Sequence, residues 1–482
     1  MMVEQLTAEP IVLSRRRRIG ILLICSMSLL IVGLDVTIVN VALPAIGSHL
    51  HSSVSGLQWA VDAYSVVLAS FLMLAGATGD RFGRRRVFLI GLSLFTAASL
   101  LCSIAPTIGA LIAFRMVQGV GASMMNPVAL SIVTNTFTDA RERAQAIGVW
   151  AAVFGISTAL GPVVGGVLVD GLGWRSIFWI NLPIGILAIA LTLRFVPTSR
   201  AEHPRRPDPV GQVLVIALLA ALTFAIIEAP RRGWGSTVII GAFALCLASL
   251  GALLRWERRR VEPLLDLRFF RSVPFAGAGI IAICAFAAMG GFLFLNTLYL
   301  QDVRHLSALR AGLDTLPMAA MVMIWPPISG RIVGTRGARI PLLVAGIGLA
   351  GGCAMLTQMS ATTPFWYLFL AYAVFGIGFG FVNTPITNAA VSGMPRAQAG
   401  VAGAITSSSR QVGQTLGVAV VGVLAAVTSH SAGLTTHSAW WVLTGCGVAV
   451  FVLGLVVTSS WARRTAVETA HALNPEYLVV RV

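Results

Sequence analysis

The strongest constraint on this chain is a series of fourteen long apolar segments, separated by short polar ones. A transmembrane helix needs about 20 apolar residues, so fourteen of them would use about 280 of the 482 residues. Only 11% of the residues are charged, against roughly 25% in an average soluble domain. The sequence therefore predicts an all-α membrane protein with spans at residues 19–46, 57–79, 87–105, 107–133, 145–169, 174–196, 210–229, 236–255, 274–300, 312–333, 338–358, 364–390, 401–428 and 438–460.

The distribution of arginine predicts the orientation of these spans. An even number of spans places both termini on one side of the membrane. If that side is cytoplasmic, 27 of the 34 arginines fall in inner segments and five in outer loops, as the positive-inside rule requires. The first apolar run is too long for a signal peptide and is expected to remain as the first span. Richness in arginine, alanine and glycine suggests a bacterium with a GC-rich genome, and hence its inner membrane.

The composition also argues against several functional classes. All 34 basic residues are arginine, and the absence of lysine argues against a P-loop ATPase and against a cofactor held as a lysine Schiff base. The six cysteines lie inside apolar runs without metal-ligand spacing, and the histidines form no HExxH pattern, so no metal site or cofactor is expected. The net charge of +16 is assigned to membrane loops rather than to nucleic-acid binding.

An internal repeat predicts the domain organisation. Gly76, Gly83 and Arg85 recur 254 residues later, and the segment 117–121 matches 374–378 at an offset of 257. Such repeats are common in secondary transporters, whose substrate site lies where the halves meet. We expect a cytoplasmic tail (1–18), a six-helix bundle (19–196), a linker with two additional spans (197–273), a second six-helix bundle (274–460) and a second cytoplasmic tail (461–482).

Few ionisable residues fall inside the predicted spans, and two of them lie at similar depths in the membrane. Asp35 lies about 24 Å above the inner face in the first span, and Arg115 about 18 Å above it in the fourth. A buried charge costs several kcal/mol, so such residues are functional candidates. A carboxylate beside an arginine can take up and release a proton as its environment changes, which predicts proton coupling by Asp35. The alternative is a fixed ion pair that only joins the two helices.

Other residues are candidates for the substrate cavity. Asp62 lies about 8 Å from the outer face in the second span, where it could bind a cationic substrate or cap the helix start. Few other acids lie in mid-span, and none in the middle of spans 10 or 13, which argues against multiply charged cations as substrates. Five aromatic residues could line the cavity, although core packing is the stronger expectation for each: Trp59, Phe154, Phe178, Trp325 and Phe379.

The loop between spans 2 and 3 carries a dense polar motif at residues 79–86. Two glycines allow a tight turn, and an acidic residue can pair with an arginine or with a helix N-terminus. The loop could act as a latch between the two halves on the cytoplasmic side, or it could serve only to set the topology. The gating candidates are Gly79, Asp80, Arg81, Gly83, Arg84 and Arg85.

Span 5 contains a glycine-rich segment that begins at Gly155 and ends at Gly165 and Gly166. Gly161 and Gly165 are four residues apart and share a helix face, so another helix can approach closely. Pro162 removes a hydrogen bond and bends the helix. Generic packing of small residues is the alternative interpretation.

Taken together, these motifs resemble the fourteen-helix drug:proton antiporter family of the major facilitator superfamily, over nearly the whole chain. The segments 79–86, 115–121 and 155–166 resemble the family's loop, helix 4 and antiporter motifs, and 34–44, 174–183 and 407–413 are typical of the fourteen-helix branch. The resemblance implies a major facilitator fold of two six-helix bundles plus two inserted helices. It also links Arg115 to proton coupling and residues 155–166 to antiport.

We therefore expect a transporter rather than an enzyme. It would export amphiphilic drugs, antibiotics or related organic compounds across the plasma membrane by alternating access, in exchange for protons. Its partners would be this small substrate, protons and the lipid bilayer, and the chain is expected to be monomeric. One alternative is a dedicated exporter of a single endogenous metabolite. Another is a polytopic membrane enzyme or sensor, which would need a catalytic cluster or a soluble domain.

Overall fold

The computed structural model describes residues 14–200, 208–260, 266–392, 399–428 and 437–473, with the side chains of some residues in α5 and α15 excluded. Within these ranges all regular structure is helical. The elements are α1 (Arg15–Leu50), α2 (Val54–Phe82), α3 (Arg84–Ser103), α4 (Ile108–Thr136), α5 (Ala140–Leu172), α6 (Ser176–Trp179), α7 (Asn181–Phe195), α8 (Pro209–Arg232), α9 (Thr237–Glu257), η1 (Leu267–Arg271), α10 (Val273–Leu298), η2 (Tyr299–Val303), α11 (Ala308–Asp314), α12 (Leu316–Arg336), α13 (Arg339–Leu356), α14 (Phe365–Val391), α15 (Ala399–Thr428), α16 (His437–Val457) and α17 (Ser460–Leu473).

The helices follow the predicted spans closely. In the described part of the chain, thirteen helices are long and apolar enough to cross a membrane, and each coincides with one predicted span. The predicted span at 401–428 corresponds to α15, which is 30 residues long and packs against α10 and α2. The all-α membrane fold is thus confirmed, while the count of fourteen spans stays a prediction.

Polar side chains cap the starts of helices, and glycines follow the ends of others. The side chains of Ser53 and Thr107 accept hydrogen bonds from the first turns of α2 and α4, which satisfies otherwise unpaired N–H groups. Gly83, Gly233 and Gly337 follow α2, α8 and α12 with φ angles of 105°, 88° and 79°. Residues with a side chain rarely adopt this conformation, so each glycine allows the chain to leave its helix sharply.

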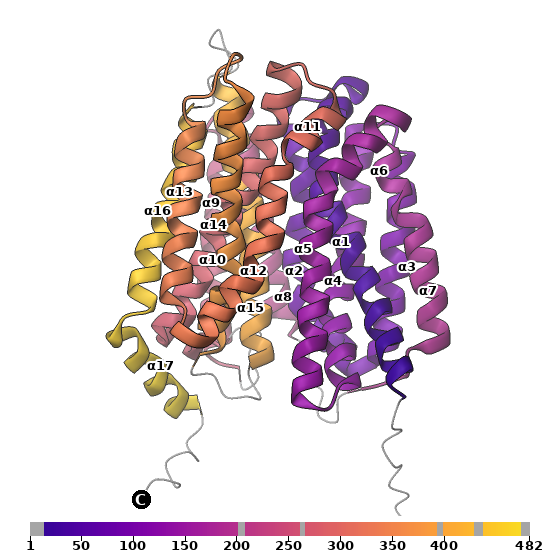
Figure 1. Cartoon of the computed structure of the whole chain (residues 1–482), viewed down its shortest axis with the longest axis vertical. Coiled ribbons are helices and arrows are strands. Elements are labelled where there is room, and N and C mark those ends of the chain that lie inside the picture. The colour runs from indigo at the N-terminus through magenta and orange to yellow at the C-terminus, as the bar shows by residue number, and fades with distance from the viewer. Residues whose placement is uncertain (1–13, 201–207, 261–265, 393–398, 429–436, 474–482) are drawn as a thin grey trace, which may run out of the picture.

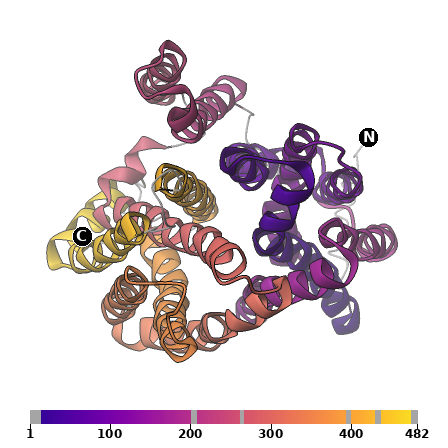
Figure 2. The same ribbon diagram turned by 90° about the horizontal axis from the view of Figure 1, so that it is seen from above.

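The helices form two bundles with the same internal arrangement (Figures 1 and 2). In the N-terminal bundle, α4 packs on α2 and α3, and α1 packs on α5. In the C-terminal bundle, α14 packs on α12 and α13, and α10 packs on α15. The order of contacts is therefore repeated along the chain, as expected for a duplicated six-helix unit.

The inserted pair α8 and α9 stands at the edge of the molecule, beside one junction of the two bundles (Figure 2). Helix α8 contacts both α2 and α15. It is hydrogen-bonded to α2 at two heights: Gln212 Nε2 donates to the Ser70 carbonyl (2.6 Å), and Trp59 Nε1 donates to Glu228 Oε1 (3.3 Å). These bonds attach the inserted pair to the N-terminal bundle.

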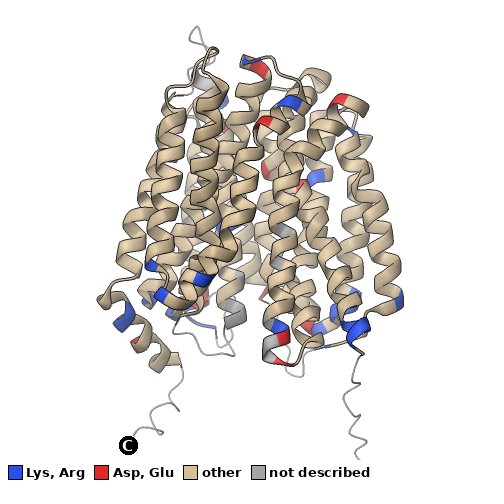
Figure 3. Cartoon of the chain, in the orientation of Figure 1, with Lys and Arg blue, Asp and Glu red and all other residues tan. Residues whose placement is uncertain are grey.

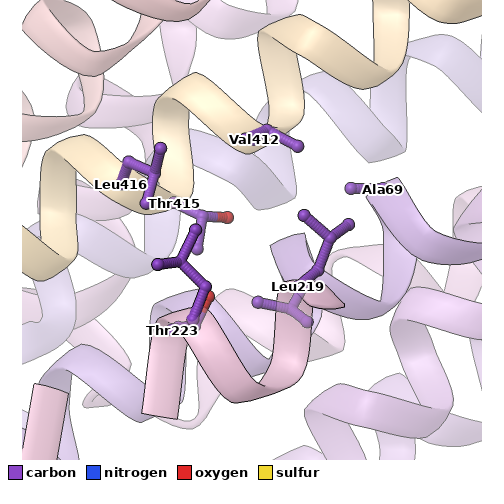
Figure 4. A pocket seen from close by; sticks show the side chains of 8 residues that line it. Ala69, Leu219, Thr223, Val412, Thr415 and Leu416 are labelled. Atoms are coloured by element: carbon purple, nitrogen blue, oxygen red, sulfur yellow. The ribbon is translucent and has the colours of Figure 1, made fainter. Parts of the chain in front are cut away.

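A small pocket lies where α2, α8 and α15 meet, and it is lined by Ala69, Leu219, Thr223, Val412, Thr415 and Leu416 among others (Figure 4). Its cavity volume is about 10 Å³, which is no more than one water molecule needs. This pocket therefore cannot hold an organic substrate, and α8 packs closely over the junction.

The two bundles are joined at the end of the molecule that carries α6 and α11, here called the far face (Figure 1). The opposite end, where α1 begins and α17 ends, is called the N-terminal face. Gln58 Nε2 donates to the carbonyls of Val418 and Ala419, and Gln301 Nε2 donates to the Val41 carbonyl (2.8 Å). The Asp170 carboxylate accepts from the first two N–H groups of α11 (3.1 and 2.9 Å). The structure is thus closed between the bundles at the far face.

Candidate functional site

The ionisable pair predicted from the sequence is brought together inside the N-terminal bundle. Asp35 of α1 and Arg115 of α4 are 0% and 1% exposed, and Arg115 Nη1 donates to Asp35 Oδ2. Arg115 Nε also donates to the Ala60 carbonyl (3.1 Å), and the guanidinium carbon lies 4.3 Å from the centre of the Tyr64 ring. The cation is therefore held by a carboxylate, a carbonyl and an aromatic face at once.

Three polar residues that the sequence analysis did not assign to the site complete this network. Gln118 accepts from Arg115 Nη1 (2.7 Å) and donates from Nε2 to Asp35 Oδ1 (2.9 Å) and to Ser99 Oγ (2.9 Å). Asn181 Nδ2 donates to the same Asp35 oxygen (3.4 Å). The carboxylate thus accepts from groups of α4 and α7, and Ser99 of α3 joins the network by accepting from Gln118 and Asn181. The i, i+3 spacing of Arg115 and Gln118, which puts both on one helix face, was the available signal.

The contacts of Asp35 bear on its role in proton coupling, which stays a prediction. Asp35 accepts from a guanidinium and two amides, and this stabilises the carboxylate. A proton on Asp35 would remove the charge that Arg115 pairs with, so the bond between α1 and α4 would weaken.

The glycines of α5 lie against α1, two residues beyond Asp35. A Cβ atom on Gly161 would lie 1.9 Å from Thr37 Oγ1, and one on Gly165 would lie 2.8 Å from Ile38 Cγ1. Thr37 Oγ1 also lies 3.2 Å from the Thr158 carbonyl, to which it donates. The two backbones touch because these positions lack side chains, which identifies α1 as the helix that faces the motif.

The same motif also contacts the C-terminal bundle. A Cβ atom on Gly166 would lie 2.6 Å from the Ala308 carbonyl oxygen, and one on Gly312 would lie 2.3 Å from the Pro162 carbonyl oxygen. Helix α5 therefore packs closely against α11 as well as against α1. Gly155, at the start of the motif, has nothing within 4 Å of such a Cβ atom, so it does not share this packing.

The loop between α2 and α3 is held by contacts with the N-terminal bundle and with the segment that follows α7. Asp80 accepts from Arg84 (Nη2 to Oδ1, 2.9 Å), and the Arg84 backbone N–H donates to the Ser199 carbonyl (3.0 Å). Arg85 donates to the Leu193 carbonyl at the end of α7. Gly83 supplies the turn, as described above.

Gly79 and Arg81 make further contacts at this end of α2. A Cβ atom on Gly79 would lie 2.8 Å from Val128 Cγ2 of α4, so α2 and α4 approach closely there. Arg81 lies over the Phe82 ring. These contacts tie the loop to its own bundle and to the start of the linker, and a latch to the other bundle stays a prediction.

Asp62 is fully buried in α2, and neither carboxylate oxygen has a hydrogen-bond partner among the described residues. Its interpretation as a helix cap is wrong, because Ser53 caps α2 (Gly56 N to Ser53 Oγ, 3.4 Å). In this closed arrangement Asp62 is shielded from water. Binding of substrate by Asp62 stays a prediction.

The aromatic candidates are dispersed over both bundles. Trp59 packs on Phe224 of α8 (6.4 Å between ring centres), and Trp325 packs on Phe381 (5.2 Å). Phe178 is buried beneath Trp174, and Phe379 meets Phe286 edge to face (5.2 Å). Phe154 belongs to α5, but its side chain lies outside the described residues. The structure does not gather these rings into one site.

Comparisons with known proteins agree with the fold. The family model described as Major Facilitator Superfamily matches residues 25–418. The Multidrug resistance protein Stp of Mycobacterium tuberculosis is 42% identical over 415 residues, covering 85% of this chain and 76% of that protein. The Methylenomycin A resistance protein of Streptomyces coelicolor is 36% identical over 444 residues, covering 91% and 92%. A crystal structure of a mutant peptide transporter POT superposes with a TM-score of 0.67 at 15% identity, covering 93% and 95%.

Proposed function

This chain belongs to the Major Facilitator Superfamily, and from that premise we propose that it exports amphiphilic organic compounds in exchange for protons. The relatives named above are a multidrug resistance protein and an antibiotic resistance protein, which supports drugs or antibiotics as the substrate class. The proposed activity is transport by alternating access rather than catalysis, and we propose that the chain acts as a monomer.

The buried Asp35–Arg115 pair is the observation that carries the proton coupling. It is the one Asp/Glu–Arg pair among the described residues in which both side chains are almost fully buried. A charge pair inside a membrane protein is costly to build and marks a proton or ion pathway by default. The alternative of a fixed pair predicts that neutralising Asp35 leaves coupling unchanged.

The helix contacts suggest how the proton is linked to opening. Helix α1 carries Asp35, then Thr37 against Gly161, then the Val41 carbonyl that accepts from Gln301 of the other bundle. Protonation of Asp35 would weaken its bond to Arg115 and let α1 shift against α5. Because α5 is also locked to α11, such a shift would loosen the contacts that close the far face. Substrate would then leave from that side.

The distribution of arginine supports a cytoplasmic N-terminal face. Basic residues gather at that end of the molecule (Figure 3). The positive-inside rule places such an end in the cytoplasm, and the far face then opens to the outside. We therefore propose a multi-pass protein of the bacterial inner membrane with both termini in the cytoplasm.

Transport into inverted membrane vesicles tests this function. Vesicles from cells that express the chain should accumulate a fluorescent dye such as ethidium when their lumen is made acidic, and an uncoupler should abolish the accumulation. Dye entry should raise the luminal pH, because protons leave in exchange. Substrate and protons that move in the same direction would contradict antiport.

A dedicated exporter of one compound is the second candidate. It is favoured by the relative that is named for resistance to a single antibiotic and that matches over 92% of its length. The two candidates share a mechanism and differ in substrate range. A resistance profile of expressing cells, with and without an uncoupler, separates them: protection against several unrelated compounds favours the first, and protection against one favours the second.

A further inference from the structure

One charged residue inside the C-terminal bundle, Arg410, takes no part in the proposed proton coupling. Arg410 lies in α15, eleven residues after the helix begins, which is about 17 Å along the helix axis. It belongs to the segment 407–413, which the sequence analysis noted only as typical of the family branch. An arginine at this depth is costly in a membrane protein and is a functional candidate by default.

Among the described residues, no ion pair joins Arg410 to an acidic side chain. The whole segment 274–460 contains two acidic residues, Asp302 and Asp314. Both lie at the far face, in η2 and at the end of α11, and Asp314 is paired with Arg310 (3.1 Å). In the other bundle, Asp35 is engaged by Arg115, and the oxygens of Asp62 make no hydrogen bond to any described residue.

The guanidinium is only partly engaged by neutral groups. Arg410 Nη2 donates to Thr387 Oγ1 of α14 (2.8 Å), and the Phe286 ring of α10 lies 5.8 Å from the guanidinium carbon. Its Nε has no hydrogen-bond partner among the described residues. The side chain is partly exposed, as is Thr387, so the group is not sealed in the core. It therefore offers a positive charge and a free donor at the junction of α10, α14 and α15.

We propose that Arg410 binds the negatively charged group of an acidic amphiphilic substrate, such as a carboxylate or sulfonate. The guanidinium presents paired N–H donors that match two oxygens of such a group. Phe286 and Phe379, which meet edge to face beside it, supply apolar surface for the rest of the molecule. This inference rests on the proposed export function and specifies its substrate class.

The charge of the substrate has a measurable consequence. Exchange of one entering proton for one leaving monoanion carries a net two positive charges inward. Exchange of a proton for a monovalent cation moves none. An inside-negative membrane potential should therefore drive the export of an anion even without a pH gradient, and should not drive that of a cation.

The test uses the purified full chain in proteoliposomes with two fluorescent probes, anilinonaphthalene sulfonate as the amphiphilic anion and ethidium as the cation. Arg410→Gln should weaken binding and transport of the anion by about tenfold or more, because a charged hydrogen bond is lost. Ethidium transport should be retained. Arg410→Lys keeps the charge without the paired donors and should give an intermediate loss. Arg336→Gln removes the same charge from the exposed end of α12 and serves as the matched control.

The outcomes separate this inference from the proposed function. Selective loss of the anion in Arg410→Gln, with potential-driven anion transport in the wild type, supports the site. A wild type that moves ethidium and not the anion overturns the site alone, as does a variant that loses both probes equally. A wild type that moves neither probe overturns the proposed export function, and the site with it.

Discussion

The two bundles share one arrangement of helices but differ at their centres. With the repeat offset of 257, Arg115 corresponds to Tyr372 and Gln118 corresponds to Phe375. Where Arg115 donates to Asp35 between α4 and α1, Tyr372 donates its hydroxyl to Asn296 between α14 and α10. The corresponding pair of helices is thus joined by an ion pair in one bundle and by a neutral hydrogen bond in the other.

The neighbouring position differs in the same way. Gln118 links Arg115, Asp35 and Ser99, whereas Phe375 stacks on Phe292, with 4.4 Å between ring centres and 12° between planes. A duplicated scaffold has kept ionisable groups at one centre and aromatic packing at the other. This difference is consistent with our proposal that the N-terminal bundle carries the coupled proton.

Removing the central cation should have the largest effect on stability. Arg115→Gln leaves the buried Asp35 without a charge partner, which costs about 3–5 kcal/mol of folding free energy. The equivalent change in the other bundle, Tyr372→Phe, removes one neutral hydrogen bond and should cost about 1 kcal/mol. Thermal unfolding in detergent compares the two variants directly. Equal losses of stability in the two variants would contradict the difference between the two bundle centres.

The next largest effect is expected where the antiporter motif meets α1. Gly161→Leu would place its side chain where Thr37 Oγ1 already lies, so α1 and α5 must separate. We expect dye export to be lost while the protein still reaches the membrane. Gly155→Leu is the matched control on the same helix, because that position is open, and it should export normally. Full export by Gly161→Leu would show that close α1–α5 packing is not required for transport.

A smaller effect is expected in the loop between α2 and α3. Asp80→Asn weakens the pair with Arg84, which is partly exposed, so stability should change little. Transport should slow severalfold if the loop acts as a latch. Asp266→Asn, which disturbs another exposed pair with an arginine, is the control and should leave the rate unchanged. A collapse of expression with a normal rate per molecule would show that the loop only sets the topology.

Much of this fold could be predicted from the sequence because a membrane imposes helix length and apolar composition on each span. The Asp35–Arg115 pair could also be predicted, since few charges occur at mid-span. The hydrogen bonds that Asn181 donates to Asp35 and that Ser99 accepts from Gln118 could not be predicted. Single polar residues inside apolar helices are common, and the direction in which each one points depends on how its helix is rotated. Partners such as Thr37 for Gly161 depend on tertiary contacts between distant segments, which no local pattern encodes.

The central claim, that Asp35 carries the coupled proton, is tested most directly by Asp35→Asn in proteoliposomes. An amide cannot take up or release the proton, so accumulation of ethidium against its gradient should fall to the level of empty liposomes. Exchange of ethidium at equal concentrations should persist, which shows that the variant is folded and still binds substrate. Uphill accumulation by Asp35→Asn at the wild-type level would contradict the account.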